Sequence, residues 1–119
     1  MRATNSIMVV ITKGPYGTAL DAEGFRCAIG CAGMDIKTTL VLLDDGVFAA
    51  LGGQDPSAIG MKPMGEAIGN ADSFGIELLV CRESLDERGI SPDRLVGGKV
   101  VTLEEIAAAM MATDGVIRF

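Results

Sequence analysis

The sequence predicts an α/β fold, a three-layer α/β/α sandwich around a parallel sheet of about five strands. Short aliphatic runs alternate along the chain with segments of helical pattern, which is the order that βαβ connections produce. The first run, Ser6 to Thr12, is continuously apolar in its middle, as in parallel strands buried on both faces. A length of 119 residues and a hydrophobic content of 49% suit one domain, residues 1–119.

In the first half of the chain we expect two strands and their helices. The Ser6 to Thr12 strand is followed by a turn, Lys13 to Thr18, which contains two glycines and a proline. Thr18 can cap a helix that continues to about Cys31 and ends at Gly33. The other expected elements are a strand over Asp35 to Leu43, a short helix over Val47 to Leu51 and a crossover helix over Met61 to Ala71.

The second half predicts three more strands. The expected elements are a strand over Ile76 to Val80, a helix over Arg82 to Arg88 closed by Gly89, a short 3₁₀ piece from Pro92, a weak strand over Leu95 to Val101, a helix that continues to about Ala112, and a last strand over Gly115 to Phe119. Thr102 and Glu105 have the spacing of a capping box at the start of the last helix.

The composition excludes several classes of function. A net charge of −6 and scattered basic residues argue against direct binding of nucleic acid. The apolar runs are too short for a membrane span or the core of a signal peptide, so we expect a cytoplasmic protein away from membranes. The mean hydropathy of +0.39 is high for a small domain, which predicts apolar surface buried in a homo- or hetero-oligomer.

Cys81 lies at the joint between a predicted strand and a predicted helix. A thiol there would face unpaired backbone N–H groups and the positive end of the helix dipole, and both favour the nucleophilic thiolate. Arg82 and Arg88 can add positive charge. The chain has no histidine, so any thiol chemistry must be activated without imidazole. The alternative interpretation of Cys81 is a small, buried, apolar side chain that ends a strand.

Other predicted features follow strands and therefore lie at the same edge of the sheet. Ligands of such folds bind at this edge, outside the carboxyl ends of the strands. The residues of this possible ligand loop are Gly14, Tyr16, Gly17, Thr18, Asp45 and Gly46. The loop lacks the spacing of nucleotide-binding glycine motifs, although its N–H groups suit a small anion or a persulfide. The adjacent Asp44 and Asp45 could bind a divalent ion, but a helix cap explains them better, and no metal site is predicted.

Cys27 and Cys31 are four residues apart and share one face of the predicted first helix. They form either a dithiol, or half of a metal site, or a pair of small packed side chains, and the absence of a second ligand pair favours packing. An odd number of three cysteines at these spacings does not indicate a disulfide framework.

Five segments, spread over nearly the whole chain, occur in a familiar order. They are Pro15-Tyr16-Gly17-Thr18-Ala19, Asp45-Gly46-Val47-Phe48, Gly53-Gln54-Asp55-Pro56, Cys81 followed by six residues and Arg88-Gly89, and Val116-Ile117-Arg118-Phe119. In this order they resemble the DsrE/DsrF-like sulfur-relay family, particularly its DsrF/TusC branch. The resemblance implies a parallel α/β fold in oligomers that pass sulfane sulfur from donor to acceptor proteins.

The resemblance also implies a role for one cysteine. In the DsrE/TusD branch a cysteine at the place of Cys81 carries the sulfur as a persulfide, whereas subunits of the F/C type are often the partner of the carrier. The first hypothesis is therefore a persulfide carrier, a sulfurtransferase that needs no metal or organic cofactor. The alternatives are a non-catalytic subunit of a sulfur-transfer oligomer and a small-ligand-binding α/β module.

Overall fold

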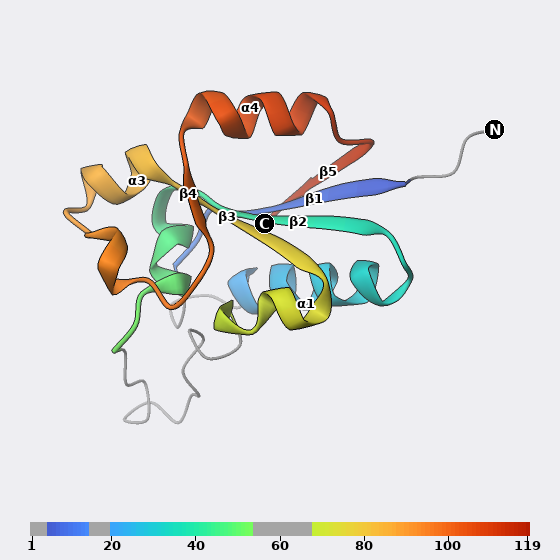
Figure 1. Ribbon diagram of the computed structural model, residues 1–119, viewed down its shortest axis with the longest axis horizontal. Coiled ribbons are helices and arrows are strands. Elements are labelled where there is room, and N and C mark those ends of the chain that lie inside the picture. The colour runs from blue at the N-terminus through green and yellow to red at the C-terminus, as the bar shows by residue number, and fades with distance from the viewer. Residues whose placement is uncertain (1–4, 15–19, 54–67) are drawn as a thin grey trace.

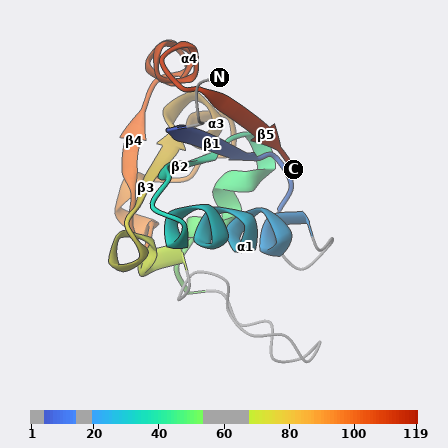
Figure 2. The ribbon, with the colours of Figure 1, turned by 90° about the vertical axis from the view of Figure 1, so that its right-hand side faces the viewer.

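The computed structural model describes residues 5–14, 20–53 and 68–119, and these form a sheet with helices on both faces. The five strands have the order β4-β3-β2-β1-β5, and each neighbouring pair is parallel. In Figure 2 the sheet lies between α1 and α4. The predicted three-layer sandwich with a parallel five-stranded sheet is therefore confirmed.

The elements follow one another in the predicted order. They are β1 (Ser6–Ile11), α1 (Leu20–Gly33), β2 (Lys37–Leu42), the 3₁₀ helix η1 (Asp44–Ala50), the 3₁₀ helix η3 (Ala71–Phe74), β3 (Ile76–Cys81), α3 (Arg82–Glu87), the 3₁₀ helix η4 (Pro92–Arg94), β4 (Lys99–Val101), α4 (Leu103–Met111) and β5 (Gly115–Arg118). None of the helices among the described residues has the length and apolarity that crossing a bilayer requires.

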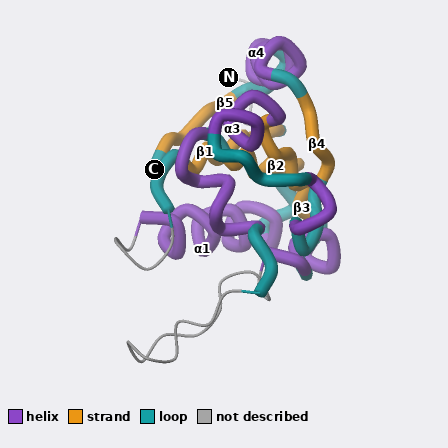
Figure 3. Tube along the Cα trace, turned by 90° about the vertical axis from the view of Figure 1, so that its left-hand side faces the viewer, coloured by secondary structure: helices purple, strands orange, loops and turns teal. Residues whose placement is uncertain are grey.

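The layers follow from the direction in which the chain crosses the sheet. From β1 to β4 each connection moves one strand along the sheet, whereas the connection from β4 to β5 returns past β1. Crossovers between parallel strands are right-handed, so connections that run in opposite directions lie on opposite faces. As a result α1 covers one face and α4 covers the other (Figure 1), and the tube in Figure 3 shows the strands between the two helices.

The core has two parts because successive side chains of a strand point to opposite faces. On the α1 face, Val9 and Ile11 of β1 pack with Phe25 and Ala28 of α1. On the α4 face lies a smaller cluster, which we call the α4-side cluster. Its buried members are Met8, Val10, Val41, Leu79, Cys81, Val101 and Ile106. Cys81 therefore belongs to the face that a single long helix covers.

One segment differs from the predictions, and another lies largely outside the described residues. The strand expected over Leu95 to Val101 is reduced to β4, and Leu95 makes only an isolated bridge to Leu51. The reason is Gly98, whose φ of +93° is not a strand conformation. The helix expected over Met61 to Ala71 has its residues 61–67 outside the described residues.

At the carboxyl edge of the sheet, η1 turns back tightly against the end of β1. Leu43 N–H donates to the Ile11 carbonyl at 3.0 Å, and a Cβ added at Gly46 would overlap that same carbonyl oxygen. Backbone oxygen cannot move aside without breaking this hydrogen bond. Position 46 therefore requires glycine because of its close packing, although its φ is not in the left-handed region.

We expect Gly46→Ala to lower the free energy of unfolding by more than about 2 kcal/mol, because the added methyl group overlaps backbone. The measurement is urea unfolding of the purified chain. Gly30→Ala is the matched control: a Cβ at exposed Gly30 of α1 meets no atom within 4 Å. This control should stabilise the chain by about 0.5–1 kcal/mol through helix propensity. Equal effects of the two substitutions would contradict the packing argument.

Candidate functional site

Cys81 is the last residue of β3 and the residue that precedes the first turn of α3. Its φ of −71° and ψ of 120° are still extended, so the chain changes from strand to helix at this residue, as predicted. The side chain, however, is 0% exposed and lies in the α4-side cluster, among aliphatic side chains of the sheet and of α4. The thiol therefore ends a strand inside the core and has no access to solvent in this chain.

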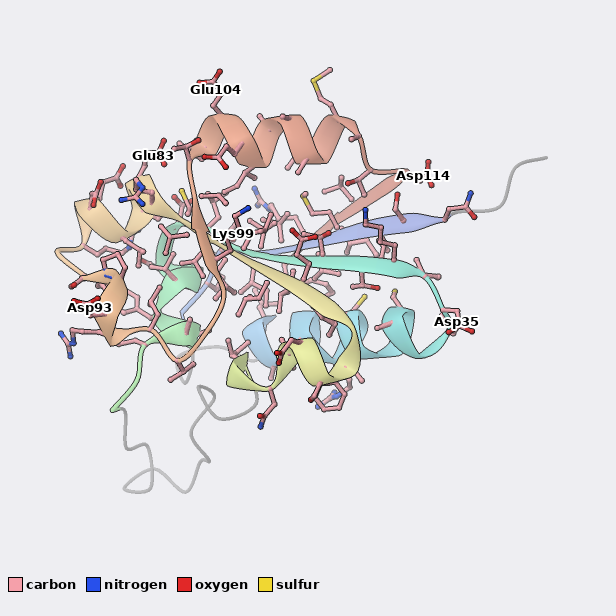
Figure 4. The ribbon with its side chains drawn as sticks, in the orientation of Figure 1. Asp35, Glu83, Asp93, Lys99, Glu104 and Asp114 are labelled. Atoms are coloured by element: carbon pink, nitrogen blue, oxygen red, sulfur yellow. The ribbon has the colours of Figure 1, made fainter. Side chains whose placement is uncertain are left out.

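The polar neighbour of the Cys81 thiol is a carboxylate. Sγ donates a long hydrogen bond of 3.9 Å to Oε1 of Glu83, and makes no side-chain cap to the N–H groups of α3. Both oxygens of Glu83 also accept from the backbone N–H of Leu103, at 3.0 and 3.1 Å. Glu83 thus joins the start of α3 to the start of α4, and Figure 4 shows it beside the end of α4 that carries Glu104.

The predicted cationic partners of Cys81 are directed elsewhere. The Arg88 guanidinium donates to Asp45 Oδ1 from Nε at 3.0 Å and lies 2.9 Å from it through Nη2, and its Nη1 donates to the Ser84 carbonyl at 3.2 Å. Arg82 is exposed. The group that the structure sets beside the thiol is an anion, opposite in charge to the one that stabilises a thiolate.

Arg88 instead ties α3 to the turn after β2. A Cβ at Gly14 would lie 3.5 Å from the Asp45 carbonyl oxygen, so the segment after β1 also contacts this turn. Gly14, Asp45 and Gly46 therefore lie together at the carboxyl edge, as the sequence predicted, and Arg88 joins them through its ion pair with Asp45. Tyr16, Gly17 and Thr18, the rest of the proposed ligand loop, lie outside the described residues.

The cap predicted for Asp44 and Asp45 is wrong. The 3₁₀ helix η1 begins at Asp44 itself, and no side chain caps it. Asp44 has a φ of +53°, a conformation that aspartate tolerates better than most residues, and its N–H donates to Ser84 Oγ at 2.9 Å. Asp45 is engaged by Arg88. Within the described part of the chain, no three His, Cys, Asp or Glu residues are grouped so that they could hold a metal ion.

Sequence reasoning missed the roles of Glu83 and Ser84. Glu83 accepts from a helix that begins 20 residues later, and Ser84, which is buried, accepts from a residue 40 positions earlier. An acidic residue in the first turn of a helix indicates a local cap, because its own helix supplies the nearest donors. Nothing in the local sequence indicates that the donor N–H belongs to another element.

The second pair of thiols lies in α1, away from the α4-side cluster. Cys27 and Cys31 are both half-buried, and Cys27 packs against the core on the α1 face. Burial raises the pKa of the Cys27 thiol, and the neighbouring Cys31 raises it further. The two side chains thus lie close enough to interact.

Together, the fold and this site define a class of protein: a parallel α/β protein with a cysteine at the carboxyl end of a strand. A model of the DsrE/DsrF-like family matches residues 5–119, and the chain belongs to this family. The match confirms the family that the sequence motifs indicated.

Individual relatives agree with the DsrF/TusC branch. The chain is 26% identical to a TusC homolog of Vibrio parahaemolyticus over 97% of this chain and 99% of that protein. It is 33% identical to the intracellular sulfur oxidation protein DsrF of Allochromatium vinosum over 75% of this chain and 66% of that protein. Among solved structures, the ychN protein from E. coli superposes with a TM-score of 0.85 at 27% identity, covering 97% of this chain and 99% of that one.

We expect Glu83→Ala to destabilise the chain by about 1–2 kcal/mol, because it leaves the Leu103 N–H and the Cys81 thiol without their acceptor. Glu83→Gln should cost less, since an amide oxygen still accepts. Both are measured by urea unfolding. Glu104→Ala is the control, since exposed Glu104 also lies in the first turn of α4 and should contribute only a few tenths of a kcal/mol through the dipole. A loss at Glu104 as large as that at Glu83 would contradict the tie between the two helices.

Proposed function

We propose that the chain acts in the transfer of sulfur between proteins, as a subunit that binds a sulfur-carrying partner. Membership of the DsrE/DsrF-like family and the similarity to an intracellular sulfur oxidation protein support the sulfur-transfer part. The burial of Cys81 is the observation that carries the subunit part, because sulfur exchange requires collinear approach of another sulfur to an accessible thiolate. A cytoplasmic location remains a prediction.

Two features of the Cys81 environment argue for packing as its role. The thiol is 0% exposed behind α4, so a donor persulfide cannot reach it without displacement of that helix. Its hydrogen bond to Glu83 uses the thiol proton, and a thiolate in the same place would meet the negative carboxylate instead. Both features are those of a buried structural cysteine, which is chemically inert.

Exposed apolar side chains support a partner. Met111 at the end of α4 is 90% exposed, and Leu103 at its start is also exposed. On β5, at the edge of the sheet, Val116 and Ile117 are both exposed although consecutive residues of a strand face opposite ways. These side chains offer apolar contacts to a partner protein.

A second candidate function is the persulfide carrier, favoured by the position of Cys81 at the carboxyl end of β3. The Cys81 thiolate would attack the outer sulfur of a donor persulfide; the donor S–S bond would break and the donor leave as a thiolate. Cys81 would then hold the transferred sulfur as Cys81–S–SH until an acceptor thiol attacked that sulfur in turn. This route needs α4 to move away from the thiol when a partner binds.

Alkylation of the folded chain separates the two candidates. In a Cys27→Ser/Cys31→Ser background, Cys81 is the one remaining thiol of the sequence. We expect native protein to react with iodoacetamide at neutral pH at least about 100-fold more slowly than urea-unfolded protein, because thiol access limits the rate. Intact mass spectrometry over time measures the modified fraction.

A persulfide donor provides the complementary test. The same background is incubated with a low-molecular-weight persulfide, alone and with candidate partner proteins, and weighed intact. The subunit proposal predicts no added sulfur atom on the chain in either case. An adduct that disappears in Cys81→Ser would overturn it in favour of the carrier, and partner dependence would identify the displacement of α4 as the trigger.

A further inference from the structure

The proposed function uses neither Cys27 nor Cys31, although these two thiols are the accessible ones. Both lie on α1 with partly exposed side chains, whereas Cys81 is sealed behind α4. Both residues belong to α1, and residues four apart lie one above the other on one face of a helix. A reagent or ion that binds two thiols of this chain at once would therefore bind Cys27 and Cys31.

The helix spacing is unfavourable for a disulfide between them. Side chains at positions i and i+4 have Cβ atoms about 5–6 Å apart. A disulfide needs Cβ atoms about 3.5–4.5 Å apart, so closing one would distort α1. The spacing instead suits one atom inserted between the sulfurs. Metal–thiolate bonds of about 2.3 Å would set two sulfurs in a linear arrangement on the order of 4.6 Å apart.

The number of ligands selects the kind of ion. Zinc in a structural site takes four ligands, and the sequence has no histidine to add to two thiolates. Among the residues that the structure describes, no third Cys, Asp or Glu joins this pair in a possible metal cluster. Two thiolates with no further ligand suit a soft ion that accepts two-coordination, and soft thiolates select monovalent copper.

From these observations we propose that Cys27 and Cys31 form a dithiolate site for a soft, two-coordinate metal ion of the Cu(I) type. On binding, the two S–H bonds break, two S–Cu bonds form, and both protons leave to solvent. Copper and sulfur keep their oxidation states. The site is independent of the proposed function and uses neither Cys81 nor its neighbours.

The test is retention of Cu(I) against a competing chromogenic chelator under anaerobic conditions. We expect the wild type to hold one Cu(I) per chain. Cys27→Ala and Cys31→Ala should each weaken binding by on the order of 100-fold or more. Loss of a residue that only hydrogen-bonds to a metal ligand already lowers metal affinity by about 10–100-fold, and loss of the ligand itself should lower it at least as much. Bound copper should also protect Cys27 and Cys31 from alkylation, as mapped by mass spectrometry.

A variant with the same number of thiols checks the geometry. In Cys31→Ala/Gly33→Cys the second thiol lies about 120° around the helix axis from Cys27. A Cβ at position 33 meets no atom within 4 Å. This variant should fold, as shown by its thermal melt, and should not recover Cu(I) binding. The proposal is overturned if the wild type releases its copper to the chelator, if this variant binds like the wild type, or if copper is held only in species of twice the monomer mass.

Discussion

The packing of α4 across one face of the sheet is the contact on which the rest of the site depends. Ile106 of α4 and Val101 at the end of β4 close the cluster that contains Met8 and Cys81. The helix reaches this place because the connection from β4 to β5 runs backwards over the sheet. Glu83 holds its first N–H group, so the start of α4 is tied to the start of α3. Helix, carboxylate and thiol thus form one packed unit.

This unit explains why a strand-end cysteine need not be a reactive one. The backbone at Cys81 has the geometry expected for a thiol before a helix, yet the side chain points into the α4-side cluster and its polar contact is with an anion. Accessibility and charge decide thiol chemistry more than position in the chain does. On α1, by contrast, two partly exposed thiols lie four residues apart and are unused by the proposed function.

The opposite side of the carboxyl edge has a different organisation. Arg88 and Ser84 hold α3 against η1 through the ion pair and hydrogen bond of Arg88 with Asp45 and the hydrogen bond from the Asp44 N–H to Ser84 Oγ. Asp45 is largely exposed, with 62% of its side chain accessible, so the ion pair adds little stability by itself. Its effect is to position the turn after β2 beside Gly14, which keeps the segments after β1, β2 and β3 together.

The sequence by itself determined the element order and the sheet. The β-branched run of β1 and the stop of α3 at Gly89, which has a φ of +63°, are local properties of side chains and backbone, and both predictions are confirmed. The family match was likewise readable from short motifs such as Arg88-Gly89. Only the tertiary structure decided which face Cys81 points to, that Glu83 accepts from Leu103, and that Arg88 pairs with Asp45. These depend on where distant elements meet, and periodicity and capping rules describe only neighbours along the chain.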